Sequence, residues 1–151
     1  MNLIAYAGLL SVAIAASASS RLAAQADPPI DTTRWVLVST APGNNRAYID
    51  TTTIQRAGDT VTAWVETRFS HPKQADEVRY TRTLARIAFD CAHAQVLALY
   101  AIAYDGPTET RTDSRAALEA ESGGWVPIPP GTPAEGELKF ACSLPPRAAP
   151  R

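Results

Sequence analysis

The chain contains two cysteines, Cys91 and Cys142, behind an amino-terminal stretch that is typical of exported proteins. This pair constrains the fold most, because an isolated pair of cysteines in an oxidising compartment usually forms a disulfide. The spacing of 51 residues fits neither a C-x-x-C redox motif nor a zinc knuckle. We therefore predict a structural disulfide between them. Two buried free thiols, or a bridge to another molecule, are the alternatives.

The amino terminus has the layout of a secretory signal peptide. Residues 3–16 form a nearly unbroken apolar run, which is too short to span a bilayer as a helix. No Lys or Arg precedes the run, but A-x-A peptidase sites end at Ala18 and Ala26. We expect a signal peptide over 1–26, cleaved between Ala26 and Asp27, because the prolines that follow give the mature chain an extended start. The alternatives are cleavage after Ala18 and a buried first strand or helix of the domain.

Length and charge limit what the mature chain can be. Cleavage would remove Arg21, one of 14 basic residues, and none of the 15 acidic ones, so the product is slightly acidic. This balance argues against general binding to nucleic acid or to anionic membranes. No other apolar segment is long enough to insert stably into a membrane after signal removal. We expect one domain over 27–144 and a disordered tail over 145–151.

The body of the chain is predicted to be β-structure. In the segment 60–69, Val61 and Val65 fall on one face, whereas Trp64 and Glu66 fall on the other, and this period of two marks a half-buried strand. His-Pro-Lys-Gln after this segment is expected to end the strand. Five segments in all are strand candidates joined by short turns: 35–40, 47–50, 60–69, 80–91 and 94–104. This order favours an antiparallel meander.

The last third is predicted to contain helices. A short one is expected over 113–122, ended by two glycines. The segment 133–142 is either a helix or a strand, and the preceding Thr132-Pro133-Ala134-Glu135 favours a helix because it matches a capping box with proline at the first helical position. The predicted class is α+β, with a small antiparallel sheet of five to six strands, a carboxy-terminal helix and one disulfide.

The order of several short motifs resembles a known bacterial family. They are Trp35-Val36, Tyr48-x-Asp50, Thr53-Ile54, Gly58-Asp59-Thr60-Val61, Trp64-Val65, Phe89-Asp90-Cys91, Tyr104-x-Gly106, Trp125-x-Pro127-Ile128, Pro130-Gly131-Thr132 and Cys142. Together they are similar to the surface-adhesin protein E-like domain family. The resemblance implies a small antiparallel sheet packed with a carboxy-terminal helix, and a location in the envelope. The family's namesake is an adhesin that binds host extracellular-matrix and plasma proteins.

The resemblance is weakest after Gly106-Pro107, where residues 111–121 are more charged and more helix-prone than the family pattern. Structural features carry over to this chain, namely the two cysteines, the tryptophans and the Pro-Gly-Thr stretch before the last helix. No ligand-binding residue of the namesake can be assigned to a position in this sequence.

No pattern in the sequence predicts catalysis, a cofactor or a metal. The two histidines, His71 and His93, lie beside turns without further ligands at suitable spacing. No serine has the context of a nucleophile elbow, and no glycine-rich phosphate loop is present. We therefore expect a protein that is not an enzyme.

One candidate interaction patch is predicted on the sheet. Its members are Trp64, Arg79, Arg82 and Arg86. Arg82 and Arg86 share one face of a strand, which would suit an anionic ligand or an acidic partner, and an exposed tryptophan is a frequent interaction anchor. The interpretations that we favour are nevertheless a solvated face whose cations pair with Glu66 and Asp76, and a tryptophan covered by the terminal helix.

These features predict an exported bacterial envelope protein, located in the periplasm, at the cell surface or in the medium. The favoured function is a non-enzymatic binding module for an unknown protein or small ligand, without affinity for nucleic acid. A periplasmic structural or envelope-maintenance protein is the first alternative, and an enzyme with an unrecognised site is the second. The sequence leaves the oligomeric state open.

Overall fold

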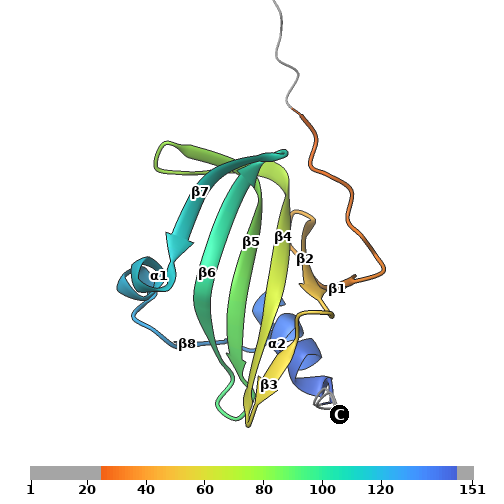
Figure 1. Ribbon diagram of the computed structural model, residues 1–151, viewed down its shortest axis with the longest axis vertical. Coiled ribbons are helices and arrows are strands. Elements are labelled where there is room, and N and C mark those ends of the chain that lie inside the picture. Colours follow the sequence, from red (N-terminus) through yellow and green to blue (C-terminus); the bar gives the residue numbers. More distant parts are fainter. Residues whose placement is uncertain (1–24, 146–151) are drawn as a thin grey trace, which may run out of the picture.

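The computed structural model describes residues 25–145 (Figure 1). The predicted signal segment up to residue 24 and the predicted tail from residue 146 lie outside the described residues. The elements are β1 (Trp35–Ala41), β2 (Asn45–Asp50), β3 (Gln55–Ala57), β4 (Thr60–Ala75), β5 (Val78–Asp90), β6 (Gln95–Asp105), β7 (Thr108–Ser114), α1 (Arg115–Ser122), β8 (Val126–Pro127) and α2 (Pro133–Ser143).

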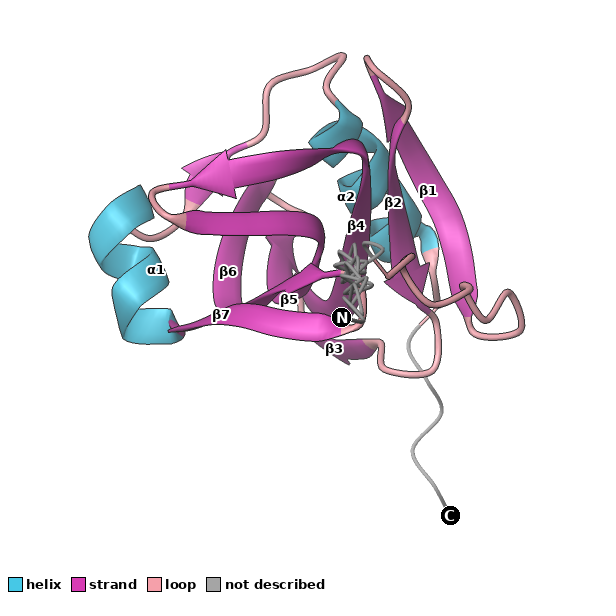
Figure 2. Ribbon diagram, turned by 90° about the horizontal axis from the view of Figure 1, so that it is seen from above, coloured by secondary structure: helices cyan, strands magenta, loops and turns pink. Residues whose placement is uncertain are grey.

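The strands form one antiparallel sheet with the order β1-β2-β4-β5-β6-β7. The short strands β3 and β8 pair with β4 and β6. Seen from above, the sheet is strongly curved, with α1 and α2 well apart (Figure 2). The α+β class is confirmed, but the eight strands exceed the expected five to six.

Strand β4 is longer than predicted, because it continues through His71 and Pro72 to Ala75. Its pairing with β5 shifts register between Arg68 and Lys73, so the proline lies where the ladder of hydrogen bonds is already interrupted. The expectation that this proline ends the strand was wrong for that reason. The extension gives the β4–β5 hairpin a long projecting tip (Figure 1).

Strand β7 was not predicted at all. It is an edge strand that pairs only with β6, and no residue in it is fully buried. An edge strand without a buried face has no alternation of apolar and polar residues to reveal it. The first residues of the helix predicted over 113–122 belong to β7, so α1 begins at Arg115. It ends as predicted at Gly123, which has a φ of 76°.

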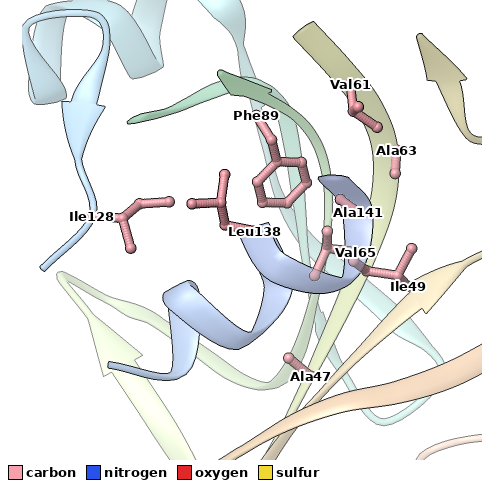
Figure 3. Close-up of a cluster of buried hydrophobic side chains, with 9 residues drawn as sticks. All are labelled: Ala47, Ile49, Val61, Ala63, Val65, Phe89, Ile128, Leu138 and Ala141. Atoms are coloured by element: carbon pink, nitrogen blue, oxygen red, sulfur yellow. The ribbon is translucent and has the colours of Figure 1, made fainter. Parts of the chain in front are cut away.

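The core lies between α2 and the sheet. Nine buried side chains form it: Ala47, Ile49, Val61, Ala63, Val65, Phe89, Ile128, Leu138 and Ala141 (Figure 3). The segment 133–142 lies in helix α2, which begins at Pro133 as predicted. The Thr132 side chain makes no capping hydrogen bond, and Glu135 instead accepts one from the Gly131 backbone N–H at 2.8 Å.

The predicted disulfide is confirmed. Cys91 and Cys142 are bonded, with their Cα atoms 5.8 Å apart. Cys91 directly follows β5 and Cys142 lies in the last turn of α2, so the bond ties the helix to the end of a central strand. Both sulfur-bearing residues pack against the core described above.

Helix α2 lies very close to β1. A Cβ atom on Gly136 would be 3.1 Å from the Val38 carbonyl oxygen, which is tighter than an ordinary contact. The next residue, Glu137, is largely buried at this contact and accepts a hydrogen bond from the Ser39 hydroxyl at 3.5 Å. Burial raises the pKa of Glu137 from 4.5 to about 7.

Stability should therefore fall as the pH rises from 4.5 to 7. The folded protein keeps the Glu137 proton up to about pH 7, whereas the unfolded chain releases it near pH 4.5. Between these two values the folded state binds more protons than the unfolded state, so raising the pH lowers the free energy of unfolding. We expect Glu137→Gln to stabilise the protein by ~2 kcal/mol at pH 8 and to flatten this slope. Urea unfolding at pH 4.5 and pH 8 measures the free energy of unfolding of both proteins. Glu77→Gln, at the exposed turn between β4 and β5, is the control, and equal slopes in both variants would contradict the assignment.

Candidate functional site

The structure brings only part of the predicted patch together. Trp64 and Arg86 are direct neighbours on β4 and β5, and Arg82 lies further along β5 on the same face. Arg79 does not join them. It is exposed near the tip of the β4–β5 hairpin, where its Nη1 donates to the Asp105 carboxylate at 2.5 Å.

Trp64 is not covered by the terminal helix. Its neighbours Ala63 and Val65 point into the core beneath α2, so Trp64 points to the opposite face of the sheet. There its ring meets the ring of Tyr100 edge to face, with centroids 6.1 Å apart. Arg86 Nη2 donates to the Gln55 side chain at 3.3 Å. Trp64 is consequently half-buried and packed rather than a free anchor.

Arg82 was expected on a solvated face, but it is buried, with 8% of its surface exposed. Its guanidinium carbon lies 3.8 Å from the centre of the Tyr104 ring, in cation–π geometry. Its Nη1 is 3.8 Å from a Glu66 carboxylate oxygen, and its Nε is 3.7 Å from one of Asp27. The buried Nε has no hydrogen-bond partner among the described residues.

Arg82 is the end of a row of three arginines. Arg46 on β2 is the direct partner of Arg68 on β4, which is in turn the partner of Arg82 on β5. We call these three residues the arginine row. Glu66 serves two of them, because it also accepts from Arg68 Nε at 2.6 Å. Of the acids named earlier as alternatives, Glu66 does pair with Arg82, whereas Asp76 pairs with Arg111.

A surface hollow of about 360 Å³ lies beside this row, and we call it the arginine groove. It is lined by Asp27, Ile30, Asn44, Arg46, Tyr48, Arg68, Phe69 and Ser70. Arg46 is exposed and forms no ion pair with any residue of the described chain. Tyr48 and Phe69 add apolar surface, and Asn44 and Ser70 add hydrogen-bonding groups. The groove therefore presents cationic, polar and aromatic contacts together.

The segment 25–34, here called the strap, forms one wall of the groove (orange in Figure 1). Near its beginning, Asp27 accepts a hydrogen bond from the Thr81 hydroxyl at 2.5 Å. In the uncleaved chain the Gln25 carbonyl lies so close to Gly106 that a Cβ atom there would be 2.2 Å from its oxygen. Cleavage between Ala26 and Asp27 would remove this contact, so in the mature chain the strap begins at Asp27, and the hydrogen bond with Thr81 holds this end.

The other end of the strap is held by an ion pair between Arg34 and Asp50. The Asp50 side chain is fully buried and also accepts hydrogen bonds from the backbone and hydroxyl of Thr52, at 3.0 and 2.6 Å. Burial opposes its ionisation, but the hydrogen bonds from Arg34 and Thr52 lower its pKa overall. Asp50 therefore stays ionised and anchors the strap at the start of β1.

A second hollow, of about 170 Å³, lies between the tip of the β4–β5 hairpin, the upper part of β6 and β7, and the end of α1. Its cation, Arg111, is already paired with Asp113 at 2.8 Å and with Asp76 at 3.6 Å. These pairs raise the pKa of Arg111, chiefly through the hydrogen bond to Asp113. The hollow is small for a ligand site, and its one cation is already paired within the protein.

The histidines do not belong to either hollow. His93 Nδ1 lies 2.8 Å from the Asp90 carboxylate at the turn after β5, and this hydrogen bond lowers the pKa of Asp90. Within residues 25–145, no three His, Cys, Asp or Glu side chains gather in a way that could hold a metal ion. Over the same range, neither helix is long and apolar enough to cross a bilayer.

The sequence revealed only one member of the arginine row. Arg46 and Arg68 lie on strands whose register depends on distant pairing, and Asp27 was singled out only as a cleavage site. One signal was available, since Glu66 and Arg68 fall on the same face of the strand as Trp64. It could not show that β2 would place Arg46 directly opposite Arg68.

The fold and the groove define a small, disulfide-linked α+β domain whose main surface feature is a cationic hollow at one end of the sheet. The chain belongs to the surface-adhesin protein E family, whose model matches residues 35–143. This match confirms the resemblance deduced from the sequence, and it supports an adhesin-like surface protein. A search of curated proteins finds no match. The strap, residues 25–34, precedes the matched residues.

Proposed function

We propose that the protein is an exported envelope protein that acts as a non-enzymatic binding module at the bacterial cell surface. The observation that carries this proposal is the family match over residues 35–143, which includes the whole sheet, α2 and both cysteines. The amino-terminal sequence supports export, because it has an apolar run followed by small-residue peptidase sites. Within the described chain, the arginine groove is the surface best equipped to contact a ligand.

The disulfide fits this assignment physically. A protein outside the cytoplasm meets oxidising conditions, and the bond between Cys91 and Cys142 is stable there. It fixes α2 on the far side of the sheet from Arg82, so the groove can engage a ligand without disturbing the core. Rigid support of this kind keeps the entropic cost of binding low.

Protease treatment of intact host cells tests the surface location. We expect added trypsin to digest the protein at exposed basic residues of the projecting β4–β5 hairpin tip, such as Lys73 and Arg79, whereas a known periplasmic protein in the same cells survives. Antibody detection of the two proteins, before and after the outer membrane is permeabilised, measures how much of each is digested. Digestion only after permeabilisation would contradict the proposal and favour a periplasmic structural or envelope-maintenance role, which the same leader and disulfide also fit. Deletion should then produce an envelope defect.

A further inference from the structure

The arginine row carries more positive charge than its neighbours neutralise. Like charges directly opposite one another on adjacent strands are destabilising. Arg46, Arg68 and Arg82 nevertheless face each other across three strands, with Glu66 and Asp27 as the nearby acids. Arg46 has no ionic partner in the described chain, although it borders the groove. Because Arg46 is exposed, water solvates this excess charge in the free protein and leaves Arg46 available to an external anion.

The buried end of the row has a donor without an acceptor. A buried N–H group without a hydrogen bond is costly, more so when the group is charged. Arg82 Nε is such a donor, and the nearest carboxylate oxygen, on Asp27, is 3.7 Å away. This distance is too long for a hydrogen bond. The negative charge of Asp27 therefore lies near Arg82, but Asp27 does not accept a hydrogen bond from its Nε.

Asp27 shows which chemistry the site accepts. Its carboxylate reaches the groove from the strap and is held by the Thr81 hydroxyl rather than by the arginines. Guanidinium groups match planar carboxylates closely, because two parallel N–H donors meet two oxygens. The net excess of about one positive charge fits single carboxylates better than a dense polyanion. The half-buried Phe69 ring provides surface for the apolar stem of an acidic side chain, whereas Tyr48 is only 8% exposed.

We propose that the arginine groove binds the carboxylate side chains of an acidic protein segment, and that Asp27 of the strap occupies part of this site in the free protein. The inference rests on the proposed function as a binding module and assigns its ligand class. The strap then acts as an internal competitor. An external glutamate or aspartate engages Arg46 and Arg68, which line the groove, and displaces Asp27. Arg82 does not line the groove, and its Nε becomes reachable for the ligand's carboxylate only once Asp27 has left.

Binding of a synthetic peptide to the purified, disulfide-bonded mature protein tests this proposal. The probe is a fluorescently labelled (Gly-Glu)4 peptide with blocked ends, and the matched control is (Gly-Gln)4. We expect the acidic peptide to bind at least ~10-fold more tightly, with an affinity that falls as salt is added. Fluorescence anisotropy measures both. A sulfated oligosaccharide of equal charge is the third probe, and we expect it to bind more weakly than the acidic peptide.

Three variants separate the groove from general charge effects. Arg46→Gln should weaken the acidic peptide by about 5-fold or more, and Asp27→Asn should strengthen it by a few-fold because the competitor is neutralised. Arg115→Gln on α1 removes the same charge from a distant exposed site and should leave binding unchanged. Arg46 is exposed, so folding is not at risk, and thermal unfolding of each variant verifies this.

Several outcomes would overturn the proposal. They are equal binding of the acidic and neutral peptides, tighter binding of the sulfated probe, equal effects of the Arg46 and Arg115 variants, or weaker binding in Asp27→Asn. Such results would leave the cell-surface location intact, because the trypsin experiment on whole cells does not depend on the groove. Conversely, a periplasmic location together with selective acidic binding would overturn the surface role and keep the site.

Discussion

Replacing Cys91 and Cys142 together by alanine should lower the free energy of unfolding by about 4 kcal/mol. The bond closes a loop of 51 residues, and without it the unfolded chain regains the conformational entropy that the cross-link removes. A domain of this size is typically stable by only about 5–15 kcal/mol, so the loss is a large part of the total. The folded structure itself loses little contact, because alanine fills most of the space beside the core.

Urea unfolding of the oxidised protein and of the double variant measures this loss. The natural protein treated with reductant should approach the midpoint of the variant, whereas reductant should leave the variant unchanged. These comparisons separate the cross-link from any change in packing. An unchanged midpoint after complete reduction, verified by the intact mass, would show that the bond contributes no stability to the fold.

The sequence predicted those parts of the fold that depend on local pattern. Alternation in 60–69 and 80–91 located β4 and β5, because one face of each strand is buried beneath α2. The Thr-Pro-Ala-Glu stretch favoured the helix at Pro133 over a strand, although Leu138 and Phe140 also fit the period of a strand. The expectation of export, together with the single cysteine pair, was sufficient to predict the disulfide.

Features that depend on tertiary contact were not predictable. Strand β7 is held by hydrogen bonds to β6 and has no buried face, so its sequence alternates threonine with charged residues and shows no apolar face. Pro72 normally marks the end of a strand, yet here a register shift accommodates it. Both cases need information about the neighbouring strand, which a single segment of sequence does not contain.

In the candidate site, too, the local features were predictable from the sequence and the tertiary ones were not. The sequence placed Arg82 and Arg86 on one face of one strand, because period two within a strand is local. The opposition of Arg46, Arg68 and Arg82 depends on the register of three strands, and the approach of Asp27 depends on the strap. The burial of Arg82 follows from both, which is why a solvated face was expected instead.

Replacing Phe89 by alanine should also destabilise the protein strongly, by about 3–5 kcal/mol. The ring is fully buried in the core that joins β5 to α2, where Leu138 and Ile128 are among its partners (Figure 3). Its removal leaves a cavity that rigid neighbouring strands cannot fill. Val36→Ala is the matched control, since Val36 lies on edge strand β1 with 38% of its surface exposed, and its loss should stay within ~0.5 kcal/mol. Similar losses in both variants would contradict the assigned core.

Combining Phe89→Ala with the loss of the disulfide tests how α2 is held. Phe89 acts on the folded state, through packing, whereas the cross-link acts on the unfolded chain, through entropy. The two losses should therefore add approximately, with a coupling of about 0.5–1 kcal/mol because Phe89 and both cysteines share one core. The triple variant should be unfolded or nearly so in water, and urea titrations in a stabilising osmolyte measure its stability. A combined loss well below the sum would mean that α2 detaches once the disulfide is absent, because Phe89 would then have lost its packing partners before the substitution was made.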